Sequence, residues 1–333
     1  MTRKEESLSK RDTGGTPSSN VPLAPLTTLG VGGMAHFFIE AHTERDIEDA
    51  IALARQHNLP LFALGGGSNV LVPDAGIKGV VLKVAMRDIV FNNDGDDILL
   101  IAGAGAFWED IVDSVGAHGL FGIENLAGIP GTVGGAAVQN IGAYGSEFKN
   151  VFEYADVING ADGSRRRITR AEAAFSYRTS FFKEHREYII THVALRLAQH
   201  GKPNISYADL IRAGSSGVPL TTSSEIAHAV RSIRSKKFPR TPGEGTAGSF
   251  FKNPIISEEL FSSLAQRFPG LPAFPQEQGT VKVPLAWILD HVLSLKGFAK
   301  GPVRLYEEHP LVIVARAGAQ AADIDAFARD IEE

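Results

Sequence analysis

Three glycine-rich loops of this 333-residue chain have the residue types best suited to binding chemistry. The first is residues 65–69, the second begins at Gly103, and the third runs from Gly122 to Gly145. Backbone N–H groups that converge where such loops meet strands form sites for anions. Clustered glycines also permit positive φ angles and close approach of the backbone to a ligand. A single loop of this kind is as often an ordered surface loop as a ligand-binding loop, but three together predict a bound nucleotide-like cofactor.

Neither standard phosphate motif accounts for these loops. Residues 65–69 lack the Lys-Ser/Thr ending of a P-loop, and Trp108 stands where a dinucleotide fingerprint would have its last glycine. The chain also has no cysteine, which excludes disulfides, thiolate zinc, iron–sulfur clusters and a cysteine nucleophile. We predict no metal site.

The composition is that of a globular protein, with 44% hydrophobic and 21% charged residues. Lys and Arg number 33 against 38 Asp and Glu, a net charge of −5, so there is no overall basic field to attract nucleic acid. The first 20 residues have no apolar stretch typical of a signal peptide, and we find no transmembrane segment. We therefore expect a cytoplasmic monomer that acts on small molecules without nucleic-acid or membrane partners.

The elements that position these loops form an α+β pattern. Strands are predicted at residues 36–40, 61–64, 79–84 and 98–102, and helices after Thr43 and at about 107–115. From about Ser223, which we expect to cap a helix, amphipathic helices follow at residues 257–267, 284–293 and 321–332, around a strand at 311–315. We predict a disordered tail at 1–20, a first domain at 21–217 with subdomains at about 21–86 and 87–217, and a second domain at 218–333.

Five motifs in order resemble the UDP-N-acetylenolpyruvoylglucosamine reductases, flavoenzymes of bacterial peptidoglycan synthesis. The motifs are residues 28–30, 65–71, 123–145, 177–183 and 247–254. The resemblance implies a vanillyl-alcohol-oxidase-type FAD-binding fold of two α+β subdomains, followed by a C-terminal α+β substrate-binding domain. It also implies noncovalent FAD, with NADPH as the reductant, in an enzyme that converts UDP-N-acetylglucosamine enolpyruvate to UDP-N-acetylmuramate.

The resemblance assigns the FAD pyrophosphate to two of the glycine-rich loops. The residues that it implies as cofactor contacts are Gly65, Gly66, Gly67, Ser68, Asn69, Gly131, Thr132, Gly135, Gly142 and Ala143. No His or Cys stands where covalent attachment of the flavin would be expected.

The implied reaction places a hydride and a proton on an enolpyruvyl ether, with negative charge spreading into the carboxylate between the two events. Such a step needs a fixed cation and a positioned acid. By resemblance, Arg178 binds the carboxylate and Ser249 donates the proton; Tyr207 and Lys237 contact the UDP phosphates and sugar, and Asn253 assists at the diphosphate or orients Ser249. Outside these motifs, Arg178 would be interpreted as an ion-pair arginine and Ser249 as a turn hydroxyl. Tyr207 would be interpreted as a core tyrosine and Lys237 as part of a solvated helix end.

The sequence departs from the family at its last residues. The family has a catalytic glutamate there in a Leu-x-x-Glu-Val-Arg pattern, whereas residues 327–333 have a helical pattern. Glu307 and Glu308 lie in a loop before Leu311, and we do not assign them this role. We expect a truncated C-terminal domain and a chain that binds FAD but reduces its substrate poorly. Residues 293–297 and 303–306 also differ from the family forms, which leaves the sugar contacts there open.

Two other interpretations stay open. An alcohol or lactone oxidase of the same flavin fold would need no NADPH and would lack Ser249 and Lys237 in their motifs. A non-catalytic nucleotide-binding homologue would keep the fold with a defunct site, and only the absent glutamate favours it. Flavin colour and its bleaching by NADPH separate these possibilities.

Overall fold

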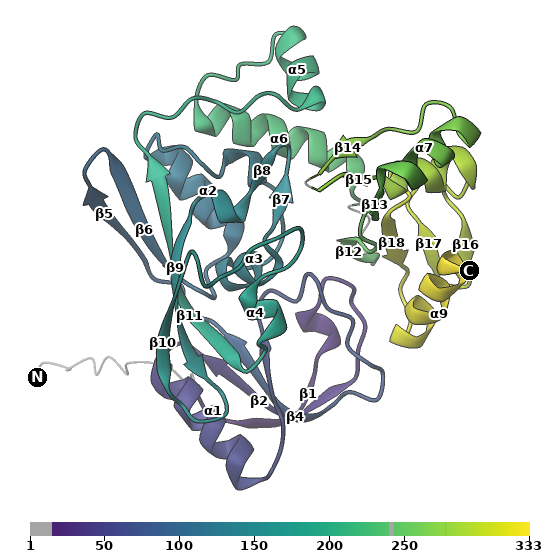
Figure 1. The fold of residues 1–333 in the computed structure, drawn as a ribbon. Helices are drawn as coiled ribbons and strands as arrows, with labels where there is room; N and C mark the ends of the chain where they lie inside the picture. Colours follow the sequence, from purple (N-terminus) through teal and green to yellow (C-terminus); the bar gives the residue numbers. More distant parts are fainter. Residues whose placement is uncertain (1–14, 240–242, 277) are drawn as a thin grey trace, which may run out of the picture.

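The computed structural model describes residues 15–239, 243–276 and 278–333. Its ribbon shows a first subdomain with β1, β2, β4 and α1, a second subdomain above it, and the C-terminal domain to one side (Figure 1). Among the described residues, no helix is both long enough and apolar enough to cross a membrane.

The first subdomain is a four-stranded sheet of order β1-β2-β4-β3, in which β2 and β3 run parallel to β4. Its elements are β1 (Ser18–Pro22), β2 (Met34–Ala41), α1 (Glu44–Gln56), β3 (Leu61–Leu64) and β4 (Ile77–Val84). As predicted, Thr43 caps α1, where it forms a capping box with Asp46 and one face is buried. The prediction of a disordered tail was wrong for residues 18–20, because their backbone pairs with β2; residues 1–14 lie outside the described part.

The second subdomain is an antiparallel sheet of order β10-β9-β11-β6-β5. Its strands are β5 (Ile89–Asp94), β6 (Asp97–Gly103), β9 (Phe152–Asn159), β10 (Arg165–Thr169) and β11 (Tyr188–Ala198). The other elements are α2 (Trp108–Ala117), η2 (Glu124–Leu126), α3 (Val133–Gln139), β7 (Gly142–Ala143), β8 (Ser146–Glu147), η3 (Phe148–Asn150), α4 (Phe181–Glu184), α5 (Ala208–Ser215) and α6 (Ser223–Lys237).

Helix α6 belongs physically to the second subdomain. Its buried residues Ile226 and Val230 share one hydrophobic core with α2 and both N-terminal sheets, whereas our boundary at residue 218 groups α6 with the C-terminal domain. Thr222 caps the helix and forms a capping box with Glu225, so the prediction that Ser223 is the cap was wrong by one residue.

The C-terminal domain contains two small sheets, of order β12-β18-β17-β16 and β13-β15-β14. Its elements are β12 (Gly245–Ser249), β13 (Ile255–Ser257), α7 (Glu258–Arg267), β14 (Phe274–Pro275), β15 (Thr280–Lys282), α8 (Leu285–Trp287), a π-helical turn (Ile288–Val292), β16 (Ala299–Lys300), β17 (Val303–Leu305), β18 (Val312–Ala315) and α9 (Ala321–Glu332). The helices predicted at 257–267, 284–293 and 321–332 are therefore present, the second as an α-helical turn that continues into the π-helical turn.

The first subdomain reaches into the C-terminal domain at two points. Leu29 and Val31 lie in the core formed by β17, β18 and α9. The carboxylate of Asp74 accepts hydrogen bonds from the first backbone N–H groups of α9, those of Ala321 at 2.8 Å and Ala322 at 2.9 Å. These contacts fix the C-terminal domain beside the loops that carry the glycines.

Candidate cofactor and substrate site

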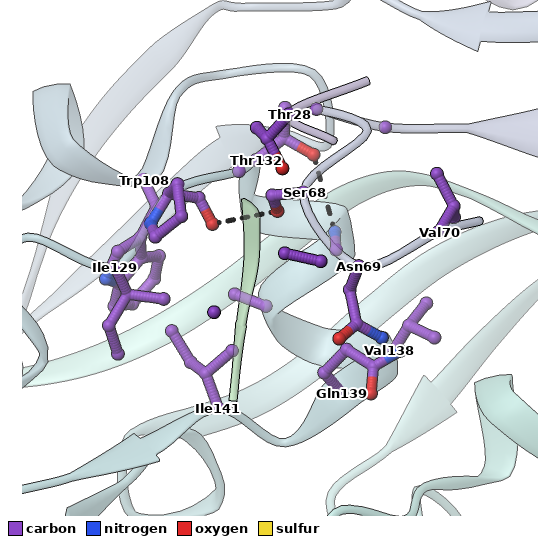
Figure 2. A pocket seen from close by; sticks show the side chains of 18 of the residues that line it. Thr28, Ser68, Asn69, Val70, Trp108, Ile129, Thr132, Val138, Gln139 and Ile141 are labelled. Carbon is purple, nitrogen blue, oxygen red and sulfur yellow. Dashed lines mark hydrogen bonds between the residues drawn. The ribbon is translucent and has the colours of Figure 1, made fainter. Parts of the chain in front are cut away.

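A cavity of about 960 Å³ is lined by residues of both N-terminal subdomains and of the C-terminal domain. This volume is at the upper end of the range of about 300–1,000 Å³ found for ligand pockets. The wall includes residues 65–70 after β3, residues 128–132 before α3, and residues 246–253 around the end of β12. Figure 2 shows labelled side chains of the first two segments, among them Ser68, Asn69 and Thr132, arranged around the pocket.

Two glycine-rich segments form one wall because their backbones lie against each other. A Cβ atom on Gly66 would lie 2.7 Å from the Cα atom of Gly131, and one on Gly65 would lie 2.8 Å from Thr132 Oγ1. Gly67 has a φ of +66°, and a Cβ there would lie 1.9 Å from the carbonyl oxygen of Leu26. A cradle of this kind presents backbone to an occupant, which suits a flat, charged dinucleotide such as FAD.

Hydrogen bonds hold the two segments in place. Ser68 Oγ donates to the carbonyl oxygen of Pro130 at 3.0 Å (Figure 2). The backbone N–H of Trp108 donates to the carbonyl oxygen of Gly131 at 3.0 Å, and its indole N–H donates to that of Leu126, also at 3.0 Å. Trp108 is 1% exposed, so at the position where a fingerprint glycine would stand this chain has a core residue.

The second glycine loop has a different task from the other two. Cβ atoms on Gly103 and Gly105 would each lie 2.5 Å from a carbonyl oxygen, that of Met86 and that of Val84 respectively. Neither glycine lines the main cavity, although Ala104 between them does. These glycines permit close packing between strand ends, and the second loop is not one of the two to which the resemblance assigns the FAD pyrophosphate.

The cofactor residues implied by the resemblance lie together, with one exception. All except Ala143 line the cavity. Ala143 belongs to the short hairpin of β7 and β8, in which it pairs with Ser146.

Arg178 lies in the cavity wall on a tight turn. Hydrogen bonds in both directions between the backbones of Ser176 and Thr179, at 3.0 and 3.1 Å, close the turn, and Arg178 has a φ of +56°. Its guanidinium donates to the carbonyl oxygens of Gly142 at 3.0 Å and of Asn140 at 3.4 Å, just beyond the end of α3. These two bonds leave further N–H groups of the guanidinium for a ligand.

The cavity has a surplus of positive charge. Arg178, Lys183, Arg234 and Lys252 line it, and among the described residues no carboxylate oxygen lies within 4 Å of their charged groups. By contrast, Arg231 pairs with Glu109 and Asp113. Burial lowers the pKa of the Arg234 guanidinium. Arg178, Lys183 and Arg234 are partly buried, and because a cation that is partly buried without a carboxylate partner is costly, such a wall is suited to anionic occupants.

Ser249 and Asn253 lie on the C-terminal side of the cavity. Ser249 ends β12 after an irregularity in its pairing with β18, and its side chain is exposed. Gly248, with a φ of +75°, precedes it and donates its N–H to Thr246 Oγ1 at 3.1 Å. Asn253 Oδ1 accepts the N–H of Leu285 at 3.0 Å, so this side chain fixes the start of α8.

Tyr207 and Lys237 come together next to the cavity but are not among the residues that line it. Lys237 Nζ lies 2.6 Å from Asp209 Oδ2 and 5.6 Å from the ring centroid of Tyr144, which itself lies 5.1 Å from the ring of Tyr207. Burial raises the pKa of Tyr144 to about 12. Lys237 is thus held by a carboxylate in this structure, an interaction that a ligand phosphate would have to replace.

Sequence reasoning assigned no role to four polar residues of this region. Lys183 and Lys252 lie inside motifs that carry the resemblance, and Tyr144 lies in the third glycine loop, so these positions could have indicated a role in the site. No sequence signal indicated a role for Arg234, because it lies at the basic end of an ordinary amphipathic helix.

Comparison with known proteins agrees with this geometry. Residues 35–169 match the family model of an FAD binding domain, and residues 240–333 match that of the UDP-N-acetylenolpyruvoylglucosamine reductase C-terminal domain. The UDP-N-acetylenolpyruvoylglucosamine reductase of Pseudomonas aeruginosa is 37% identical over 93% of this chain and 92% of its own length. The reductase of Shewanella baltica is 36% identical over 91% and 88%.

A solved structure supports the same assignment. The crystal structure of the reductase from Thermus caldophilus matches 95% of this chain and 94% of its own, with a TM-score of 0.65 and 27% identity. The α+β fold with an FAD-binding part and a C-terminal domain of the reductase family, which the motifs imply, is confirmed. From its family-model matches, its relatives and its fold, the chain belongs to the UDP-N-acetylenolpyruvoylglucosamine reductase family.

Proposed function

We propose that this protein is an NADPH-dependent reductase that converts UDP-N-acetylglucosamine enolpyruvate to UDP-N-acetylmuramate by means of FAD, in peptidoglycan precursor synthesis. The observation that carries the proposal is one cavity that combines a backbone cradle at residues 65–67 and 131 with three cations, Arg178, Arg234 and Lys252, that have no carboxylate partner among the described residues. The cradle suits a dinucleotide, and the cations suit a substrate with a diphosphate and a carboxylate.

FAD, when bound, supplies the hydride transfer from NADPH to the substrate double bond. The backbone of Gly65, Gly66 and Gly131 would hold it, because these glycines line the cavity and the absence of side chains lets their two segments pack together as a wall of main chain. The remaining steps of the reaction are tasks for side chains of this protein.

Arg178 binds the substrate carboxylate in our proposal. Arg178 lines the cavity together with Lys183 and Lys252, and a planar guanidinium can bind a carboxylate with two parallel bonds. As the hydride reaches the terminal carbon, negative charge moves into that carboxylate, and the fixed cation stabilises it. Ser249, exposed at the end of β12, then donates its hydroxyl proton to the neighbouring carbon.

The UDP end of the substrate binds next to α5 and α6 in our proposal. Tyr207 precedes α5 and Lys237 ends α6, so a phenol and an ammonium group are available for a diphosphate. Asp209 competes for this ammonium at 2.6 Å. Asn253, whose Oδ1 fixes α8, supports the segment that carries Ser249. We also propose that the protein works as a monomer in the cytoplasm, where UDP-sugars and NADPH are made.

An anaerobic titration tests the function. We expect purified protein to show a flavin band that NADPH bleaches and that UDP-N-acetylglucosamine enolpyruvate restores, with UDP-N-acetylmuramate as the product. The rate of this recovery also tests the expectation from the sequence that the chain reduces its substrate poorly. Bleaching without recovery would overturn the assignment of the substrate and keep that of the cofactor. A colourless protein that takes up no FAD would overturn both.

A further inference from the structure

Lys183 has no task in the chemistry above, yet its ammonium group lies in the cavity wall beside Arg178. Its Nζ donates to the backbone carbonyl oxygen of Arg178 at 3.1 Å and to Gln139 Oε1 at 2.9 Å. Both acceptors are neutral, and among the described residues no carboxylate oxygen lies within 4 Å of this nitrogen. Among the described residues, the Lys183 ammonium group is therefore bonded to neutral oxygen atoms and forms no ion pair.

The surroundings are unfavourable for a lysine. Burial lowers the pKa of Lys183, and the positive charges of Lys252, Arg178 and Arg186 lower it further. A neutral side chain at this position would avoid that cost. The hydrogen bonds of the ammonium group must therefore offset the cost of keeping a lysine here.

The Arg178 backbone, which accepts one of these hydrogen bonds, has a positive φ angle. Arg178 is the second central residue of the turn between Ser176 and Thr179, a position whose positive φ favours glycine or asparagine. An arginine held there is strained and persists only where the surroundings fix it. The hydrogen bond from Lys183 ends on the carbonyl oxygen of this strained residue.

The second acceptor connects the turn to α3. Gln139 is the last residue of α3, and the carbonyl oxygens that receive the Arg178 guanidinium, those of Asn140 and Gly142, follow it directly. Ser180 Oγ adds a bond to the carbonyl oxygen of Val138 at 2.8 Å. Lys183 thus ties the backbone of Arg178 to the same helix end that holds its side chain.

We propose that Lys183 is a positioning residue, which holds Arg178 in its left-handed turn and thereby directs the guanidinium at the substrate carboxylate. The proposal rests on the proposed function, since the task of Arg178 comes from there. It predicts that Lys183 acts on the substrate only through Arg178.

The test compares Lys183→Met and Lys183→Arg with the wild type in the two half-reactions measured separately. For Lys183→Met we expect reoxidation of the reduced flavin by the enolpyruvyl sugar to slow on the order of 10–100-fold, mainly in kcat, as for a small misplacement of a catalytic group. Bleaching by NADPH and flavin content should stay within about twofold of the wild-type values. Lys183→Arg should restore most of the rate, because its guanidinium also donates to carbonyl oxygens.

A double variant decides between acting through Arg178 and touching the substrate. If Lys183 acts through Arg178, Arg178→Ala/Lys183→Met should be as slow as Arg178→Ala alone; multiplied losses would overturn the proposal. In hydrogen exchange, the peptide that contains residues 176–182 should exchange faster in Lys183→Met, with no change in Lys300→Met, an exposed lysine paired with Asp330. Unchanged exchange would also overturn it. Failure of the wild type to be reoxidised would refute the proposed function instead, and the exchange result would still report on the turn.

Discussion

The two sides of the cavity are built from different parts of the chain. The proposed cofactor side is backbone, where residues 65 and 66 lie so close to residues 131 and 132 that no side chain fits between them. The proposed substrate side consists of side chains on a turn, a strand end and two helix ends, among them Arg178, Ser249 and Lys237. A backbone wall depends on the fold of both subdomains, whereas a wall of side chains can be altered one group at a time. The predictions below probe this difference.

The largest effect is expected on the substrate side. Ser249→Ala removes the proposed proton donor and should slow reoxidation of the reduced flavin by the enolpyruvyl sugar by about 10²–10⁴-fold. Because Ser249 is exposed at the end of β12, flavin content and melting temperature should stay at wild-type values. Stopped-flow absorbance measures both half-reactions. Ser262→Ala, an exposed serine on α7, is the matched control, and equal rates in the two variants would remove Ser249 from the mechanism.

On the proposed cofactor side, we expect one added methyl group to be enough to prevent FAD binding. Gly67→Ala places a Cβ 1.9 Å from the carbonyl oxygen of Leu26 at a φ of +66°, so we expect flavin content to fall by more than about tenfold as the loop is displaced. Gly163→Ala is the matched control, since it has a φ of +78° with open space around it. This control should lose only about 1 kcal/mol of stability and keep its flavin. The ratio of flavin to protein absorbance, with circular dichroism for folding, checks both variants. A Gly67→Ala protein with full flavin would contradict the backbone cradle.

The connection between the two sides is expected to have a moderate effect. Asp74→Ala removes the carboxylate that accepts the first N–H groups of α9, and should lower the free energy of unfolding by about 2 kcal/mol. Asp325→Ala, on the exposed side of α9 and paired within the helix with Arg329, should cost less than about 0.5 kcal/mol. Urea denaturation measures both, and equal losses would show that Asp74 does not link the domains.

The smallest effect concerns the pH dependence of stability at His309, which feels the charge of Lys237 from the proposed substrate side. Burial, with the positive charges of Lys237, Lys296 and Arg234, lowers the pKa of His309 to about 4, from 6.5 in the unfolded chain. Between these pH values the unfolded chain binds the proton and the folded protein does not, so stability falls as the pH drops from 6.5 towards 4. Relative to wild type, His309→Gln should therefore gain roughly 1–2 kcal/mol between pH 7 and pH 5. Parallel stability curves from denaturation at several pH values would contradict this.

Local sequence signals predicted the elements well where the physical cause is local. Thr43 with Asp46 three residues later, followed by apolar residues at helical spacing, is sufficient to define α1. Ser257 before α7 is a second such case. Where two candidates stand side by side, as Thr222 and Ser223 do, only the packing decides, because Ser223 is buried and Thr222 is free to cap.

The sequence pattern did not predict which elements far apart in the chain pack against each other. The amphipathic face of α6 shows that the helix is packed but not on which subdomain, and Leu29 and Val31 give no sign that they enter the C-terminal core. For the same reason the pairing of Lys237 with Asp209 was not predicted, since the two residues lie 28 positions apart.

The sequence alone determined which residues are available for the chemistry. Its five motifs named the family, the glycines of the cradle, and Arg178 and Ser249, because motif identity and spacing are properties of the chain itself. The tertiary structure decided how these residues are held: that Gly66 meets Gly131, that Ala143 lies outside the cavity, and that Arg178 stands in a left-handed turn beside Lys183. The physical reason is that backbone proximity and side-chain partners depend on segments far apart in the sequence, and these meet only when both subdomains and the C-terminal domain pack together.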